Sequence, residues 1–152
     1  MAQLAFGAPQ GGEVTAGDGT IETAGTTLTV NQASEKLALN WQSFNIGADE
    51  SVVFAQPSSS SIALNRILGH DPSVILGNLT ANGQVFLLNP NGVLFGAAAT
   101  VDVGGLLAST LSLSNEDFLA GRYRLYADES GSGEVINAGT LTAHDGGYVA
   151  LA

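Results

Sequence analysis

The chain has 152 residues, enough for one domain with a hydrophobic core, and charged residues make up only 12% of it. It has 4 basic and 14 acidic residues, so Lys36, Arg66, Arg122 and Arg124 cannot form the basic face that nucleic acids or anionic membranes require. The absence of cysteine excludes disulfides, thiolate chemistry and cysteine-based zinc sites.

The sequence also predicts no stable insertion into a membrane. No apolar run approaches the roughly 18 residues of a membrane-spanning helix. Residues 1–9 lack a basic region followed by an apolar core, so they are not a signal peptide. If the protein is exported, its signal has already been removed, and Met1 is then an added start.

Short strands joined by polar turns are expected from the N-terminus onward. Residues 10–25 predict a cap of short strands, with Val14 and Ile21 pointing inward. Trp41 and Phe44 are the largest side chains nearby and are expected to fill the core. The next apolar runs predict strands at 27–30 and 51–55, with further apolar runs at 37–41 and 44–47. Residues 62–68 can form either a strand or one helical turn, and we favour the strand. Polar connections are expected at 31–36, in the solvated serine run 56–61 and in the turn 69–72.

Residues 74–110 alternate short aliphatic runs with tight Asn/Gly corners and show no helical period. Asn82-Gly83 is a pair that can adopt positive φ at low cost. Residues 89–92, Asn-Pro-Asn-Gly, fit a type I turn position by position. The segment therefore predicts a few residues of strand, a bend, and a few more residues of strand.

The one helix signal lies at residues 114–121. Ser114 or Asn115 can cap its start, the two acidic residues that follow suit the positive end of the helix dipole, and Gly121 suits its end. Phe118 and Leu119 are expected to hold this single turn by packing.

The chain after the helix predicts a strand, a loop and a last coil. Residues 122–126 alternate like a strand, and residues 127–134 form an acidic Gly/Ser loop. A last coil begins at Val135. Residues 148–152 stop within an apolar strand, so we expect the natural protein to continue well past Ala152.

A repeat is visible within the chain. Leu141-Thr142-Ala143 matches Leu79-Thr80-Ala81 at an offset of 62, and residues 21–29 hold a fainter copy. This offset fits about three coils of roughly 20 residues each in a solenoid. A β-sandwich has strands and turns at similar spacing, so periodicity alone leaves both architectures open.

Several segments together resemble the N-terminal secretion domain of filamentous-haemagglutinin-type exoproteins, the passengers of bacterial two-partner secretion. The resemblance runs over roughly residues 11–152, and its segments are 31–32, 40–47, 51–57, 63–69, 83–96, 101–106 and 115–119. The most specific part is the Asn-Pro-Asn-Gly segment with its flanking strands. No such motif occurs before Asn89, which suggests a subgroup that lacks the second, earlier copy found in some branches.

This resemblance implies an all-β fold, a right-handed parallel β-helix with an N-terminal cap and extra-helical antiparallel strands. Residues 1–152 would be a single secretion domain at the N-terminus of a much longer β-helical exoprotein. The protein would be secreted, or held at the cell surface of a Gram-negative bacterium, by way of the periplasm.

The resemblance also implies a partner. A cognate outer-membrane β-barrel transporter would recognise the domain through periplasmic POTRA modules, and the domain, a monomer, would nucleate β-helix folding at the surface. The acidic surface would suit a basic receptor groove. Adhesive, haemagglutinating, cytolytic or toxic activity would lie downstream.

The candidate site residues are Asn89, Pro90, Asn91, Gly92 and Asn45. They have two readings, shaping of a coil corner and direct recognition by the transporter, and the two can coexist. The sequence predicts no catalytic residue, no metal ligand and no cofactor.

Two other functions are alternatives for a chain of this kind. A polysaccharide-cleaving enzyme needs clustered carboxylates with Ca²⁺ or a base, but His70 and His144 each stand beside an Asp in a turn. Asp128, Glu129 and Glu134 lack the alternating pattern of a dedicated Ca²⁺ site. An adhesive module is the second alternative, because tyrosines beside basic residues can stack on sugars; these residues are Tyr123, Tyr126, Arg122 and Arg124.

Overall fold

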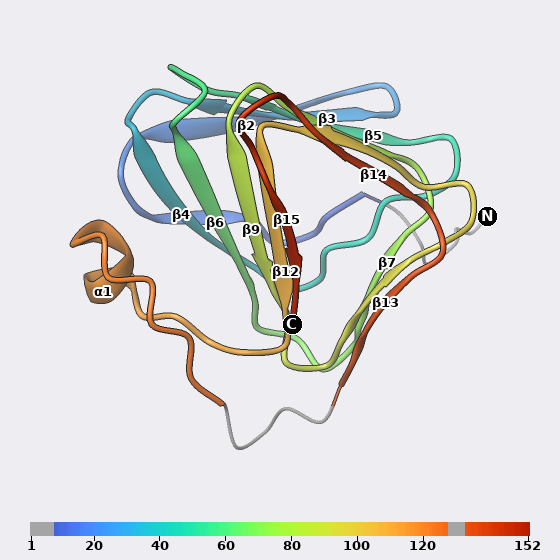
Figure 1. Cartoon of the computed structure of the whole chain (residues 1–152). Helices are drawn as coiled ribbons and strands as arrows, with labels where there is room; N and C mark the ends of the chain where they lie inside the picture. Colours follow the sequence, from blue (N-terminus) through green and yellow to red (C-terminus); the bar gives the residue numbers. More distant parts are fainter. Residues whose placement is uncertain (1–7, 128–132) are drawn as a thin grey trace.

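The chain winds into a right-handed parallel β-helix of triangular cross-section, seen nearly end-on in Figure 1. The structure is a computed structural model and describes residues 8–127 and 133–152. Its elements are β1 (Glu13–Ala16), β2 (Gly19–Ala24), β3 (Thr27–Gln32), β4 (Lys36–Trp41), β5 (Ser51–Ala55), β6 (Ile62–Ile67), β7 (Ser73–Ile75), β8 (Asn78–Ala81), β9 (Gln84–Leu88), β10 (Val93–Phe95), β11 (Thr100–Val103), β12 (Gly105–Ser109), α1 (Asn115–Leu119), β13 (Val135–Asn137), β14 (Thr140–Ala143) and β15 (Val149–Leu151).

Three sheets form the sides of the solenoid. Their strand orders are β1-β4-β6-β9-β12-β15, β14-β11-β8-β5-β3-β2 and β13-β10-β7. Beyond the cap, neighbouring strands are parallel and in register, as in the pairing of Leu79 with both Val52 and Val101. Parallel pairing of successive coils rules out the sandwich alternative and confirms the solenoid.

The coils are unequal, so the predicted division of the repeat into three short coils of similar length is wrong. Leu79 pairs with Val101, and Val101 pairs in turn with Leu141. The offset between Leu79 and Leu141 therefore spans two coils and not three, and the first of them is little more than half as long as the second. The longer coil carries an excursion, described at residues 110–127 and 133–134, which leaves the solenoid after β12 and returns at β13.

The interior of the solenoid is a continuous apolar column. Leu28, Val52, Leu79 and Val101 lie at matching positions on stacked strands and are almost wholly buried. Stacking equivalent residues in this way lets each coil bury its apolar side against the next, which is how solenoids obtain their stability.

The two largest side chains near the start of the column fill its N-terminal end, as expected. The rings of Trp41 and Phe44 pack edge to face, with their centres 5.5 Å apart. The indole Nε1 of Trp41 donates a 2.9 Å hydrogen bond to the buried Oδ1 of Asn65, so the polar atom of this tryptophan is satisfied.

The expected N-terminal cap is present. Strand β1 runs antiparallel to β4, and β2 runs antiparallel to β3 through a hairpin whose Gly25 has φ +59°. The polar crossing expected at 31–36 is shorter than predicted, because β3 extends to Gln32 and β4 begins at Lys36. Gln32 is buried, and its amide donates to the carbonyls of Ser34, Glu35 and Ile62.

A second, smaller core lies outside the solenoid, where the excursion covers the outer face of the β4-β6-β9 sheet. Helix α1 begins after Ser114, whose side chain accepts from the backbone of Asp117, and Gly121 follows it with φ +79°. Phe118 is fully buried, but Leu119 is 48% exposed, so only one of the two expected anchors packs.

Residues 122–126 do not form the expected strand. Only Tyr126 pairs, in an isolated antiparallel bridge with Ser112. The alternation in the sequence arises instead because this segment lies along the outer face of the sheet, and Leu125 packs against the second core there.

The corner at Asn82-Gly83 has a different cause from the one predicted, because neither residue adopts positive φ. The Asn82 amide instead bonds the backbone of Gln56 on the preceding coil, with Oδ1 accepting at 2.8 Å and Nδ2 donating at 2.7 Å. A Cβ on Gly83 would lie 2.7 Å from the carbonyl oxygen of Ser61. The glycine is needed because two coils approach closely there.

Replacing Gly77 with alanine is expected to destabilise the fold strongly. A Cβ there would lie 2.2 and 2.3 Å from the backbone oxygens of Gly47 and Glu50, which cannot move without shifting a coil. We expect a loss of about 3 kcal/mol in the free energy of unfolding, measured in urea. Gly25→Ala is the control, because Gly25 has positive φ but nothing within 4 Å, and it should cost about 1 kcal/mol. Equal losses in both variants would show that close packing of the coils is not the cause.

The serine run 58–61 is more ordered than the predicted solvated loop. Ser61 is fully buried, and the hydroxyls of Ser58, Ser60 and Ser61 all donate to the carboxylate of Glu35 on the preceding coil, at 2.9–3.3 Å. The bonds from Ser61 and Ser58 lower the pKa of Glu35 below its ordinary value of 4.5.

Acid is therefore expected to weaken this loop. Because the folded-state pKa of Glu35 is depressed, its stabilising effect is present above pH 4.5 and is lost as the pH falls through the folded pKa. The difference in melting temperature between wild type and Glu35→Gln should be largest near neutral pH and should shrink below pH 4.5. A difference that grows on acidification would contradict this assignment.

Candidate functional site

Residues 89–92 form the expected turn at the corner between β9 and β10. The N–H of Gly92 donates to the carbonyl of Asn89 at 3.0 Å, which closes the turn. The side-chain Oδ1 of Asn89 accepts from the N–H of Asn91 at 2.9 Å, as predicted for an asparagine in the first position. Gly92 has φ +117°, a value that side chains rarely tolerate.

The amide of Asn89 points into the molecule and is fully buried. Its Nδ2 donates to the carbonyl of Asp71 at 3.1 Å and to the hydroxyl of Ser73 at 3.0 Å, both on the preceding coil. Its backbone N–H donates to the carbonyl of Ser109, at the end of β12 on the next coil. Asn89 therefore joins three successive coils at one corner.

The rest of the motif is also stacked between coils. Asn91 Nδ2 donates to the carbonyl of Gly69 at 2.8 Å, and the carbonyl of Pro90 accepts from the N–H of Gly133 at 3.1 Å. A Cβ on Gly133 would lie 2.2 Å from the backbone of Asn91, so the next coil passes directly over the turn. Pro90 and Asn91 are partly exposed.

Asn45 forms a hydrogen bond with strand β7 from the preceding coil, whereas Asn89 does so from the following coil. The Oδ1 of Asn45 accepts from the N–H of Val74 at 2.8 Å, next to the Ser73 that Asn89 bonds. Ile46 then forms an isolated parallel bridge with Ile75, as the start of a third side for that coil. The structure thus brings Asn45 and Asn89 to one short strand, β7.

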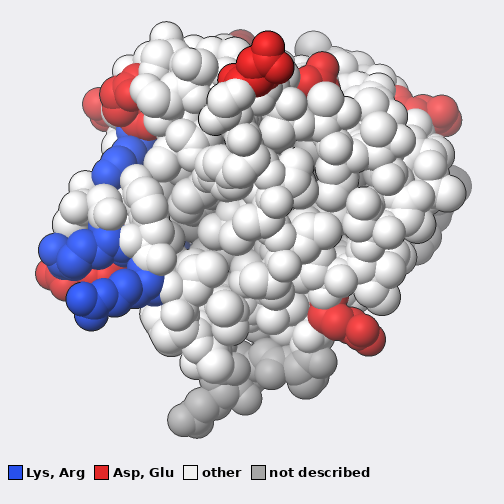
Figure 2. Space-filling model, in the orientation of Figure 1, with Lys and Arg blue, Asp and Glu red and all other residues white. Residues whose placement is uncertain are grey.

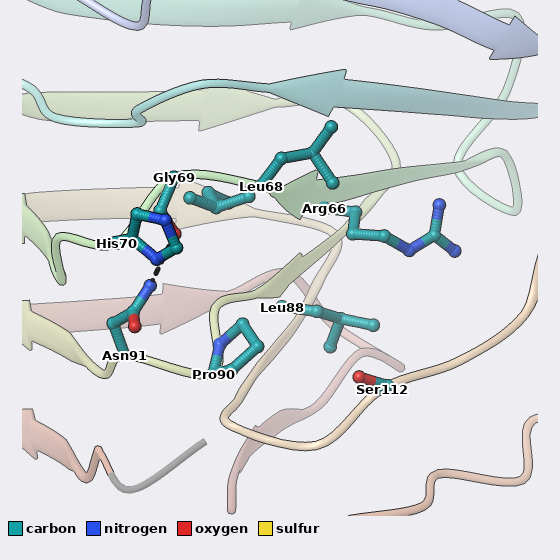
Figure 3. A pocket seen from close by; sticks show the side chains of 9 residues that line it. Arg66, Leu68, Gly69, His70, Leu88, Pro90, Asn91 and Ser112 are labelled. Carbon is teal, nitrogen blue, oxygen red and sulfur yellow. Dashed lines mark hydrogen bonds between the residues drawn. The ribbon is translucent and has the colours of Figure 1, made fainter. Parts of the chain in front are cut away.

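Two hollows open beside the turn, and Asn91 lines both. The first, about 200 Å³, lies between the end of β6 and the end of β9 (Figure 3), and its lining includes Leu68, His70, Leu88 and Pro90. The second, about 330 Å³, is lined by Pro72, Asn91, Gly92, Val93, Leu94, Gly133, Glu134 and Ile136.

Sequence reasoning missed Leu68, which is 49% exposed at the mouth of the first hollow. A signal was available. Leu64 and Arg66 lie at alternate positions of β6, and Leu68 continues this alternation directly after the end of the strand. The excursion covers Leu64 but does not reach Leu68.

The basic side chains near the excursion are engaged in holding it. Lys36 donates to the carbonyls of Phe118 and Leu119, at 3.1 and 3.3 Å. Arg66 donates to the carbonyl of Leu113 and to the side chains of Asn40 and Asn115, and burial lowers the pKa of its guanidinium. Figure 2 shows the basic side chains gathered on this side together with acidic ones, and further acidic side chains near the edges of a largely uncharged face.

The residues considered for catalysis, metal binding and sugar stacking lie at separate places among the described residues. His144 lies 2.8 Å from Asp102 of the neighbouring coil, not beside the adjacent Asp145. Asp128 and Glu129 lie outside the described residues. Within 8–127 and 133–152, no three His, Cys, Asp or Glu side chains are grouped so that they could hold a metal ion.

Tyr123 is 42% exposed, and its ring lies against aromatic residues of the second core. Its ring meets that of Phe86 edge to face at 5.6 Å, and the ammonium of Lys36 lies 5.4 Å from its centre. Tyr126 is 54% exposed, but no second ring stands beside it to extend a stacking surface in the part of the chain that the structure describes.

Comparison with known proteins agrees with the fold. The crystal structure of the HMW1 secretion domain from Haemophilus influenzae matches with a TM-score of 0.83 and 34% identity, over 87% of this chain and 36% of that chain. Two heme/hemopexin-binding proteins from Haemophilus influenzae are 43% and 44% identical over 105 and 106 residues. Each match covers 69% of this chain but only 12% and 11% of those proteins.

Among the described residues, no helix is long and apolar enough to cross a membrane. The family model of the TPS secretion domain matches residues 5–152. This chain therefore belongs to the TPS secretion domains, the secretion domains of exoproteins that two-partner secretion exports across the outer membrane.

Proposed function

We propose that this domain is the export signal of its exoprotein, that the periplasmic POTRA modules of a cognate outer-membrane transporter recognise it, and that it then nucleates β-helix folding at the cell surface. In this role it acts as a monomer. Adhesive, toxic or ligand-binding activity belongs to the whole exoprotein, of which the domain is one part.

The arrangement of edge strands carries the nucleation part of the proposal. Strands β13, β14 and β15 belong to one coil, and each lies at the edge of its sheet. Their backbone groups form parallel templates on all three sides, to which further strands can add in register. Burial of apolar surface on each added coil would drive folding forward without a nucleotide.

The charge of the domain supports recognition by a basic partner. With a net charge of −10, and with Lys36 and Arg66 engaged in holding the excursion, the charge that the domain offers to a receptor is mainly negative. Such complementarity chiefly raises the association rate and depends on ionic strength.

Secretion in a two-gene system tests this proposal. The domain, supplied with a signal peptide, would be expressed in a Gram-negative host with and without the candidate transporter, and release into the medium would be scored. We expect release only with the transporter. Binding of the purified partners should weaken as salt is raised. Release without the transporter would overturn the proposal, and salt-insensitive binding would remove its electrostatic part.

A further inference from the structure

The outer surface of the Asn89–Gly92 corner is apolar and shaped. We call it the corner surface and define it by the side chains around its two hollows: Leu68, Pro72, Pro90, Asn91, Leu94 and Ile136. Leu68 is 49% exposed on one side of the turn and Ile136 is 47% exposed on the other. Few other large apolar side chains of the described chain are so exposed, and these two flank a single rigid turn.

The asparagines of the turn are not what this surface presents to a partner. Asn89 is fully buried, and both of its side-chain atoms are bonded within the chain. The side-chain amide of Asn91 donates to the carbonyl of Gly69 and to the Oδ1 of Asn89. These bonds fix the turn, so the apolar walls of the hollows are held in place before any partner arrives, which lowers the entropy lost on binding.

Two carboxylates border the corner surface without a cationic partner. Asp71 and Glu134 are both exposed, on the coils before and after the turn, and neither carboxylate makes a hydrogen bond or ion pair within the described residues. Arg66 itself lines the first hollow, but its guanidinium is directed toward the excursion, where Leu113 and Asn115 accept its hydrogen bonds. The surface thus combines the two hollows with two carboxylates that have no ion-pair partner among the described residues.

We propose that the corner surface docks an extended segment of the cognate transporter's periplasmic region, with apolar side chains in the two hollows and Lys or Arg beside Asp71 and Glu134. This rests on the proposed function and names the part of the domain that would be recognised. Buried apolar anchors bordered by charged pairs are the usual make-up of an interface that is both stable and specific.

Matched substitutions test this docking surface on the whole 152-residue chain and the purified transporter in detergent. Leu68→Asp places a charge at the first hollow, and Leu119→Asp places one at an equally exposed leucine on α1. We expect Leu68→Asp to weaken binding about tenfold or more and Leu119→Asp to leave it within about twofold. Both variants should melt close to wild type, because neither side chain is buried.

A charge-reversal pair gives an independent reading. Asp71→Lys with Glu134→Lys should also weaken binding about tenfold and should flatten its salt dependence. Asp18→Lys with Asp49→Lys is a control pair of the same charge change, at two exposed positions away from the corner surface. Transporter-dependent export of the same variants should follow binding.

The outcomes separate the two proposals. If wild type binds and both sets of corner variants bind equally well, the corner surface is not the docking site, while the proposed function stands. If wild type neither binds nor depends on the transporter for release, the proposed function fails and this inference fails with it. Self-association of wild type, detected by sedimentation and abolished by Leu68→Asp, would make the surface an interface between two copies and would also overturn the proposal.

Discussion

Phe118→Ala is expected to lower the free energy of unfolding by about 3–5 kcal/mol and to release the excursion from the sheet. Phe118 is fully buried, and its ring centre lies 6.2 Å from those of both Phe86 and Tyr123. The second core that it completes is small, so few other contacts can close the cavity. Urea unfolding would measure the loss, and hydrogen exchange would show whether residues 110–127 open before the solenoid does.

Leu119→Ala is the matched control, because it changes the next residue of the same helix at a position that is 48% exposed. We expect its effect to stay within about 0.5 kcal/mol. If the two variants lose equal stability, the helix itself and not the buried ring holds the excursion. If Phe118→Ala leaves hydrogen exchange in the excursion unchanged, Arg66 and Lys36 suffice to hold it.

Asn89→Ala is expected to cost about 3 kcal/mol, because it removes four side-chain hydrogen bonds from a buried corner. The substitution leaves the carbonyl of Asp71, the hydroxyl of Ser73 and the N–H of Asn91 without their present partner. Each buried polar group left unsatisfied costs about 1–3 kcal/mol, and relaxation or water would recover part of the sum. The unfolding midpoint in urea measures this, with Asn78→Ala as control, because exposed Asn78 makes one long side-chain bond, at 3.5 Å.

The same variant separates the two roles considered for the motif. If the amide acts by shaping the corner, export of Asn89→Ala should fall together with stability and should recover partly at lower temperature. Lost export with an unchanged circular dichroism spectrum and an unchanged unfolding midpoint would contradict this, because it would mean that the side chain is read directly by the transporter.

Local features of this chain could be predicted from its sequence because they depend on near neighbours. The turn at residues 89–92 is closed by hydrogen bonds among its own residues. Helix α1 is capped by Ser114, whose hydroxyl accepts from the N–H of Asp117, only three residues further along the chain. Most strands were expected for a similar reason, since short apolar runs between Gly and Asn corners suit a pleated, half-buried ribbon. The family resemblance rested on these same local segments.

Features that depend on which coils stack were decided only by the tertiary structure. The repeat that links Leu79 to Leu141 consists of one short coil and one long coil. The sequence did not reveal this inequality, because an inserted excursion leaves the register of the strands on either side unchanged. Gly83 and Gly77 are required by backbone oxygens from another coil. The serine run 58–61 is ordered by Glu35, which lies on the preceding coil and far away in the sequence.

The features of the candidate site likewise divide into those that local sequence determines and those that depend on the tertiary structure. The sequence by itself determined that Asn89, Pro90, Asn91 and Gly92 bend the chain, because a turn needs only four consecutive residues. Only the tertiary structure decided that Asn45 and Asn89 both form hydrogen bonds with strand β7. It also decided that Leu68 and Ile136 stay exposed on either side of the turn. Whether a side chain is exposed depends on which distant segments cover it. For the outer face of β6, the path of the excursion decides which side chains are covered.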